Sequence, residues 1–198
     1  MTTDIIDRLV GIEAGSAVDA LRLRRGQARD NAQASYDALF DAQDATGVTL
    51  SERLAVATFV TAVHGAESVH AHYRDLLART AGDDLAAAVD HVAARARTEG
   101  PYGRFPDTAD LRDEDAPGPE FSVDPDAVHT LDRRLTAALE HTHLLVFRPR
   151  EAAPEALARL AEAGWDASEI VTLSQLVAFL SFQIRVVEGL SSLKESLS

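Results

Sequence analysis

Residues 51–77, SERLAVATFVTAVHGAESVHAHYRDLL, carry the signals that decide the fold. The four residues 49–52, TLSE, precede an apolar run and have the pattern of a capping box. In such a box the threonine hydroxyl accepts from a free backbone N–H, while the Glu52 carboxylate bonds back to the threonine backbone. The run that follows is rich in Ala and Val, with Leu beside them, and Ala and Leu favour helix. The pattern predicts one helix over residues 50–77, with three histidines and Glu67 near its middle.

Periodicity elsewhere in the chain is also helical, and no segment has the alternation of a half-buried strand. The 198 residues suffice for one domain with a sizeable core. We therefore expect a single all-α domain over residues 1–198. Its further helices are expected at residues 16–44, 83–97, 126–139, 154–163 and 167–190.

The charge is strongly acidic, with 32 acidic and 19 basic residues and a formal net charge of −13. Such a surface repels phosphate backbones, so we expect no nucleic-acid partner. One basic cluster interrupts it, and we interpret this cluster as a solvated helix face paired with nearby aspartates. It comprises Arg22, Arg24, Arg25 and Arg29.

Two absences narrow the chemistry and the location. The chain has no cysteine, which excludes its own disulfides, thiolate nucleophiles and Cys-ligated zinc. No apolar run reaches the roughly 18–20 residues that a membrane span needs. The start, MTTDIIDRLV, has no basic segment before an apolar stretch. We expect a cytoplasmic protein without a membrane partner and without a cofactor.

Residues 99–126 form an acidic segment that holds five of the seven prolines. It shows no helical or strand periodicity, and a stretch of this length without regular structure is unusual inside a compact domain. Its aromatic residues Tyr102, Phe105 and Phe121 favour docking on the rest of the protein. Three alternatives stay open, namely a lid, an arm that wraps a partner subunit, and disorder.

The C-terminal part contains a second capped helix. Residues 166–169, DASE, have the same start as TLSE and lead into IVTLSQLVAFLSFQIRVVEGL, which is apolar on most faces. That coverage is typical of a central buried helix or of a subunit contact. The likeness between the two helix starts indicates two weakly related helical halves.

The run over residues 51–77 resembles the central helix of the alkylhydroperoxidase D-like, or carboxymuconolactone decarboxylase, superfamily. There the motif is E-R, an apolar helix, and then C-x-x-C-x-x-x-H. The run LARLAEAGWDASEIVTLSQLVAFLSFQIRVVEGL is similar to the second conserved segment of the peroxidase-related branch of that superfamily. DIIDRLVGI and QASYDALF are similar to the beginning of its CMD domain proteins. The matching residues of the second segment are Gly164, Trp165, Glu169, Ile170, Phe179, Phe182 and Arg185.

The resemblance implies an all-helical, partly repeated fold that assembles as dimers, trimers or hexamers, and a dithiol that reduces hydroperoxides with a Glu and His relay. In this chain Ala66 and Val69 stand at the two cysteines and Tyr73 at the relay histidine, whereas Glu52 matches the E-R glutamate. Peroxide reduction needs an attacking thiolate and a resolving thiol. This chemistry would therefore require a partner that supplies the thiols, such as a cysteine-bearing paralogue.

The histidines of the stretch offer other chemistry. On one continuous helix, His64, Glu67 and His70 fall within an arc of about 120°. The outer two are about 9 Å apart along the axis, so one metal ion would need further ligands. Candidate further ligands are His91, His129, His141, His143 and Glu140.

Three hypotheses remain for this stretch. In the first, His64 and Glu67 perform acid–base chemistry on a small organic molecule, with Glu52 as an orienting group. In the second, His64, Glu67 and His70 contribute to a metal site. In the third, these are polar residues of a partly buried helix with ordinary hydrogen bonds. The protein would then be a non-catalytic oligomeric binding or accessory protein that keeps the fold as a scaffold.

Overall fold

The computed structural model describes residues 4–41, 47–105, 111–124 and 130–197. Within these residues the regular structure is helical, and the one β-type pairing is an isolated bridge between Gly103 and Ala116. The predicted all-α class is confirmed. The helices are α1 (Ile5–Val10), α2 (Ala17–Leu23), α3 (Gly26–Phe40), α4 (Leu50–His64), α5 (Glu67–Ala81), α6 (Asp83–Ala96), η1 (Arg112–Glu114), α7 (Arg133–Phe147), η3 (Pro149–Glu151), α8 (Pro154–Glu162) and α9 (Ala167–Ser196).

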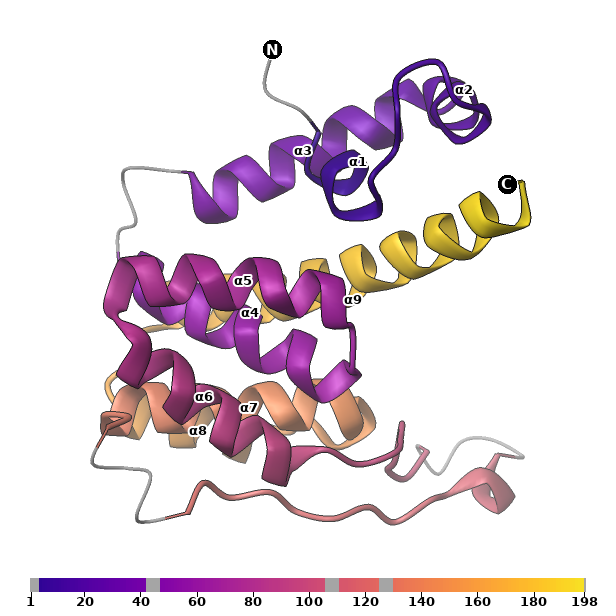
Figure 1. Ribbon diagram of the computed structural model, residues 1–198. Helices are drawn as coiled ribbons and strands as arrows, with labels where there is room; N and C mark the ends of the chain where they lie inside the picture. Colours follow the sequence, from indigo (N-terminus) through magenta and orange to yellow (C-terminus); the bar gives the residue numbers. More distant parts are fainter. Residues whose placement is uncertain (1–3, 42–46, 106–110, 125–129, 198) are drawn as a thin grey trace.

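The helices are arranged in layers (Figure 1). Helices α1–α3 form an N-terminal layer, α4 and α5 lie in the middle, and α6–α8 form the opposite side. Helix α9 packs against α4 and α7, and its C-terminal half projects beneath the N-terminal layer, where it packs against α1. It therefore ties the N-terminal layer to the remaining helices.

The prediction of one helix over residues 50–77 is wrong, because the chain reverses at Gly65. Helix α4 ends at His64, and Gly65 takes the left-handed conformation (φ 71°) that an L side chain rarely adopts. A Cβ atom at this position would also lie 2.7 Å from the Arg97 guanidinium. Helix α5 begins at Glu67 and folds back on α4. The arc calculated for the histidines on one continuous helix therefore does not exist.

Other helix boundaries follow the sequence more closely. The predicted helix over residues 16–44 is two helices, since α2 ends at Leu23 and α3 starts at Gly26, and residues 42–44 lie outside the described part. The helix expected from Asp126 begins at Arg133, where Asp132 caps it, and residues 125–129 are not described. The starts near residues 83, 154 and 167 agree with the expectation.

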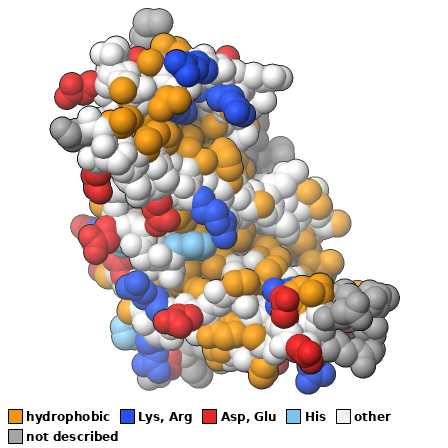
Figure 2. All heavy atoms as spheres, turned by 90° about the vertical axis from the view of Figure 1, so that its right-hand side faces the viewer, with side chains coloured by type: hydrophobic (Ala, Val, Ile, Leu, Met, Phe, Trp, Pro, Cys, Tyr) orange, Lys and Arg blue, Asp and Glu red, His pale blue; other side chains and the backbone are white. Residues whose placement is uncertain are grey.

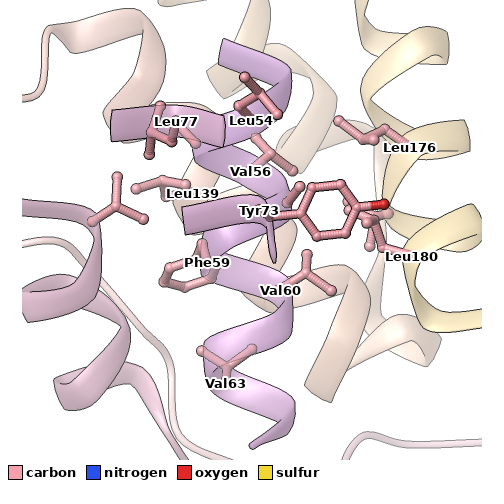
Figure 3. Packing of buried hydrophobic residues seen from close by; sticks show 14 of the residues in the cluster. Leu54, Val56, Phe59, Val60, Val63, Tyr73, Leu77, Leu139, Leu176 and Leu180 are labelled. Atoms are coloured by element: carbon pink, nitrogen blue, oxygen red, sulfur yellow. The ribbon is translucent and has the colours of Figure 1, made fainter. Parts of the chain in front are cut away.

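Helix α4 is the centre of the core. Its residues 53–61 are all buried, and the helix packs against α5, α6, α7 and α9. Such all-round burial explains why the run is apolar on every face rather than amphipathic. Figure 3 shows this packing, in which Leu54, Val56, Phe59, Val60 and Val63 meet Tyr73 and Leu77 of α5, Leu139 of α7, and Leu176 and Leu180 of α9.

The basic cluster differs in part from its interpretation as a solvated face. Arg24 and Arg25 are exposed, but Arg22 is buried and donates to the side chains of Asp4 and Asp7, which are buried too. The predicted pairing with aspartates is confirmed for Arg22. The prediction that Arg22 is solvated is wrong, because its side chain is only 8% exposed. A guanidinium buried to this extent needs carboxylates beside it, and Asp4 and Asp7 provide them.

The described parts of the acidic segment dock on the helices. The Tyr102 backbone N–H donates to the Phe147 carbonyl at 2.6 Å, and Gly103 pairs with Ala116. Further along, the Phe121 ring lies 4.7 Å from the ring of His143, and Val123 is buried. We call residues 111–124 the strap, because its residues 120–123 contact Glu140 and His143 of α7 and Arg148 at the end of that helix. Residues 106–110 and 125–126 of the segment lie outside the described part.

Helix α9 is long and apolar enough to cross a membrane, by length and composition alone. This differs from the expectation that the chain has no stretch of that kind. The central helix of a soluble protein meets the same criterion. In this structure α9 packs against α1, α4 and α7, although only 39% of its most apolar window is buried inside the chain.

Candidate functional site

The predicted acid–base residues are not brought together as a site. His64 is the last residue of α4, where its Nδ1 donates to the Val60 carbonyl at 2.8 Å. Burial lowers the pKa of His64, and Arg185 lowers it further. Glu67 is exposed at the start of α5 and has no hydrogen bond or ion pair with a described residue. No hydrogen bond or ion pair among the described residues joins His64 to Glu67.

Glu52, predicted as an orienting group, belongs to a structural cluster. The TLSE capping box is present, and Glu52 Oε1 also accepts from Arg134 Nε at 2.6 Å. The DASE capping box is present as well, and its Glu169 accepts from the same guanidinium at 2.9–3.0 Å. Arg134 also lies over the Trp165 ring, 4.0 Å from its centroid. The glutamates of both capping boxes thus converge on one arginine.

The positions that match the family motif face the core. Ala66 is the N-cap residue of α5, and Ala66, Val69 and Tyr73 are all buried. The Tyr73 hydroxyl donates to Gln183 Oε1 at 2.7 Å, and burial raises its pKa well above the usual value. A helix N-terminus is where a thiol pKa is lowered, so the two motif positions lie where thiolates would be stabilised. Ala66 and Val69 supply apolar packing there instead.

The metal hypothesis finds no ligand cluster. No group of three or more His, Cys, Asp or Glu side chains among the described residues has metal-binding geometry. His70 Nδ1 lies 3.3 Å from the Thr58 carbonyl oxygen and 3.4 Å from Thr61 Oγ1, and its Nε2 lies 3.2 Å from Asp90 Oδ1. The last contact lacks hydrogen-bond geometry. His70 thus connects α4, α5 and α6, and His129 lies outside the described part.

A cavity of about 420 Å³ lies between α7, α8 and the strap. Apart from His143, its α7 residues Ala137, Glu140, His141 and Leu144 lie on one face of the helix, and its α8 residues Glu155, Ala156, Arg159 and Leu160 lie on one face of theirs. We call it the α7–α8 pocket. Its lining residues are Glu120, Phe121, Ala137, Glu140, His141, His143, Leu144, Arg148, Glu151, Ala153, Glu155, Ala156, Arg159 and Leu160.

His141 is the unusual residue of this pocket. Its side chain is buried, and neither ring nitrogen has a hydrogen-bond partner among the described residues. Burial lowers its pKa, and the Arg159 guanidinium lowers it further, so the ring is neutral near pH 7. A neutral imidazole has one N–H donor and one acceptor nitrogen, and leaving both unpaired inside a protein costs about 1–3 kcal/mol per group.

The neighbouring His143, by comparison, has a hydrogen-bond partner at one ring nitrogen. Its Nε2 donates to the Ala96 carbonyl at 3.1 Å, and its ring lies 4.7 Å from the rings of both Phe121 and Phe147. Burial also lowers its pKa, partly offset by the bond to Ala96. His143 therefore fixes the strap on α7 and leaves His141 as the free imidazole of the pocket.

The charged residues of the pocket divide into paired and unpaired groups. Arg148 forms ion pairs with Glu151 and Glu120, and Glu140 accepts from the Val123 backbone at 2.9 Å. Arg159 is exposed and forms no ion pair with a described residue. A neutral base and an unpaired guanidinium thus line one cavity. This combination can remove a proton from a bound molecule and stabilise the negative charge that develops.

From the sequence, His141 is expected only as one candidate further metal ligand. No local signal identifies it, because the run Glu140-His141-Thr142-His143 lies beyond the helix expected over residues 126–139 and is equally consistent with a surface position. On a helix His141 and His143 point about 200° apart, so different neighbours must cover them. Helix α8 and the strap line the pocket around His141, and these tertiary contacts cannot be derived from the sequence.

Comparisons with known proteins identify no relative: no family model, no curated protein and no solved structure matches this chain. The function must therefore be argued from the site itself.

Proposed function

We propose that this protein performs acid–base chemistry on a small organic molecule in the α7–α8 pocket, with His141 as the proton-transferring group. The observation that carries the proposal is the unpaired, buried and neutral imidazole on the wall of a cavity large enough for a small ligand. Buried polar groups without partners are rare in proteins and are retained where a function uses them.

In this proposal His141 accepts a proton from a carbon or oxygen atom of the ligand. Its lowered pKa keeps it unprotonated near pH 7, which is the form that a general base requires. Arg159 holds the oxygen on which negative charge develops, and Phe121 with Leu144 and Leu160 supplies apolar walls. The residues first expected in this role, His64, Glu67 and Glu52, are assigned to structure or to the surface.

The test is proton exchange at carbon. The probes are a small ketone, a lactone and a β-keto acid in D2O, with deuterium uptake next to the carbonyl followed by NMR. We expect wild type to accelerate the uptake for at least one probe, and His141→Gln to lose about 100-fold of that acceleration. His91→Gln, an exposed histidine on α6, is the control and should retain it. Equal rates for wild type and His141→Gln would contradict the proposal.

A stability measurement separates function from structure at the same position. His141→Leu removes the unpaired polar atoms without changing the side-chain volume greatly, so we expect the free energy of unfolding to rise by about 1–3 kcal/mol. His143→Leu is the matched control and should lower it, because the bond to Ala96 is lost. Urea unfolding of both variants provides the measurement. A fall in stability for His141→Leu would indicate a structural histidine instead.

The family resemblance enters as part of this proposal. We propose a cysteine-free relative of the alkylhydroperoxidase D-like superfamily, supported by the all-helical fold and by the place of Ala66 and Val69 at the start of α5. Hydroperoxide reduction is the less favoured activity, because the chain holds no thiol and a cysteine-bearing partner would have to supply both. The cytoplasmic location stays a prediction.

The uncovered face of α9 favours a second candidate function, that of a homo-oligomeric scaffold without catalysis. Val171 and Phe182 are 56% and 47% exposed to solvent. Together with the exposed Ala178 they lie along one stripe of the helix. Hydrophobic side chains also gather on the side of the molecule toward which the end of α9 points, between charged groups (Figure 2). A second copy of the chain would cover such a stripe.

For this candidate we expect Phe182→Glu to reduce the oligomer to monomer in sedimentation velocity, since a charge on the stripe opposes its burial. Leu157→Glu on α8, where the leucine is 45% exposed, is the matched control and should leave the assembly unchanged. A wild-type protein that sediments as a monomer up to about 100 μM would exclude the scaffold.

A further inference from the structure

A second cavity, of about 370 Å³, lies where α1, α3 and α5 meet. It is separate from the α7–α8 pocket and shares no residue with it. Helices α1 and α3 belong to the N-terminal layer, whereas α5 belongs to the middle of the molecule, so the cavity lies at the boundary between them (Figure 1). Its lining residues are Ile5, Arg8, Gln33, Tyr36, Asp41, His72, Leu76 and Arg79.

The polar groups of this cavity are organised around His72. Its Nε2 lies 3.1 Å from the Tyr36 hydroxyl and 3.5 Å from Arg8 Nη2. A guanidinium can only donate, so Nε2 is the acceptor nitrogen and the ring proton is on Nδ1. Burial lowers the pKa of His72 to about 4, with Arg8 adding to the effect, and the ring is therefore neutral. The tyrosine hydroxyl donates to His72 Nε2 and accepts from the Arg8 guanidinium.

Two cations line the cavity in a protein of strongly negative charge. Arg8 has no carboxylate partner among the described residues, and its guanidinium is hydrogen-bonded to the Tyr36 hydroxyl and lies 3.5 Å from His72 Nε2. Arg79 pairs with Asp75 on the same helix, and both side chains are largely exposed, so solvent and solutes can reach this guanidinium. Asp41 is the one acidic residue in the lining. Two guanidinium groups therefore face one carboxylate across the cavity.

We propose that this cavity binds a small oxyanion, a carboxylate or a phosphate, held by the guanidinium groups of Arg8 and Arg79. The planar fork of Arg8 is suited to two oxygens of one anion, and the Tyr36–His72 pair fixes the wall beside it. Because Arg8 belongs to α1 and Arg79 to α5, the anion bridges the N-terminal layer and the middle helices. Binding therefore strengthens the contact between these two parts. This site does not depend on the chemistry proposed for His141.

The probes are inorganic phosphate and succinate, titrated at constant ionic strength against sodium chloride. We expect a saturable rise in melting temperature and slower amide hydrogen exchange in α1–α3 with at least one of them. Arg8→Ala should weaken the apparent affinity at least tenfold. The matched control is Arg24→Ala, an exposed arginine of the N-terminal layer without an ion pair to a described residue, and it should bind as wild type does. His141→Gln should bind as wild type does as well.

The outcomes separate the alternatives. Saturation with phosphate alone identifies a phosphate site, and saturation with succinate alone identifies a carboxylate site. A response no larger than that to chloride would overturn the proposal. So would an equal loss of affinity in Arg8→Ala and Arg24→Ala, because it would mean a general effect of surface charge. Tyr36→Phe keeps the proposal testable if Arg8→Ala fails to fold, and we expect it to weaken binding through the loss of the hydroxyl beside His72.

Discussion

Replacing Arg134 with methionine will lower the free energy of unfolding by about 2–4 kcal/mol and will melt the whole molecule in one step. This arginine binds Glu52 at the start of α4 and Glu169 at the start of α9. It also donates to the backbone carbonyls of Gly47 and Gly164. Removal of the guanidinium leaves the two carboxylates with only their capping-box bonds and takes a donor from each of the two carbonyls, and a hydrophobic side chain cannot replace any of the lost bonds.

The expected loss of unfolding free energy in Arg134→Met is smaller than the loss caused by breaking a fully buried ion pair. Breaking such a pair typically costs about 3–5 kcal/mol, but Arg134 is partly exposed and water can solvate part of the remaining charge. The matched control is Arg133→Met, the exposed neighbour on the same helix, which should change stability by less than about 0.5 kcal/mol. Urea unfolding monitored by circular dichroism measures both. Equal effects for the two variants would show that the cluster around Arg134 contributes little.

The cluster also shows how far the sequence specifies the fold. Both capping boxes were predictable, because each is a local pattern of four residues whose hydrogen bonds are satisfied within one turn. The apolar run after the first box likewise predicted a helix from local propensity. That the two box glutamates meet at Arg134 was not predictable, since this contact joins residues 82 and 35 positions apart. Local patterns fix where helices start, but not which helix starts meet.

The break at Gly65 shows the converse error. A glycine inside a helical pattern is tolerated, so residues 50–77 were interpreted as one helix. The tertiary structure instead uses Gly65 for a left-handed turn that sends α5 back along α4. Every prediction that depended on helical spacing across residue 65 failed with it, including the arc of His64, Glu67 and His70. The capping role of Glu52 was predicted independently of this spacing and is confirmed.

The α7–α8 pocket could not be derived from the sequence either, and the reason is burial. A histidine in the run Glu140-His141-Thr142-His143 is equally consistent with a surface position. Its burial is a tertiary property, because His141 lines a pocket together with α8 and with Glu120 and Phe121 of the strap. The aromatic content of the acidic segment predicted that it docks, but not on which helix. The candidate site is therefore a property of tertiary contacts that no local pattern contains.

Replacing Arg22 with methionine will cost about 3–5 kcal/mol, the largest effect expected of any prediction here, and it will act on the N-terminal layer first. The guanidinium and the carboxylates of Asp4 and Asp7 are each no more than 8% exposed. Without Arg22, the remaining cation beside these carboxylates is Arg29, which is 25% exposed and contacts both. One cation cannot compensate two buried carboxylates, so α1 and α2 must open to let water reach them.

Amide hydrogen exchange distinguishes local from global loss. In Arg22→Met we expect the amides of α1–α3 to exchange at least 100-fold faster, while those of α4 and α7 change little. Arg24→Met, two residues away and exposed, is the control and should exchange as wild type does. The double variant Arg22→Met with Asp7→Asn should regain part of the protection, because one of the two buried charges is then removed together with its partner. If the double variant is less protected than Arg22→Met, the uncompensated charge is not the cause, and the loss must come from the packing of the Arg22 side chain against α1.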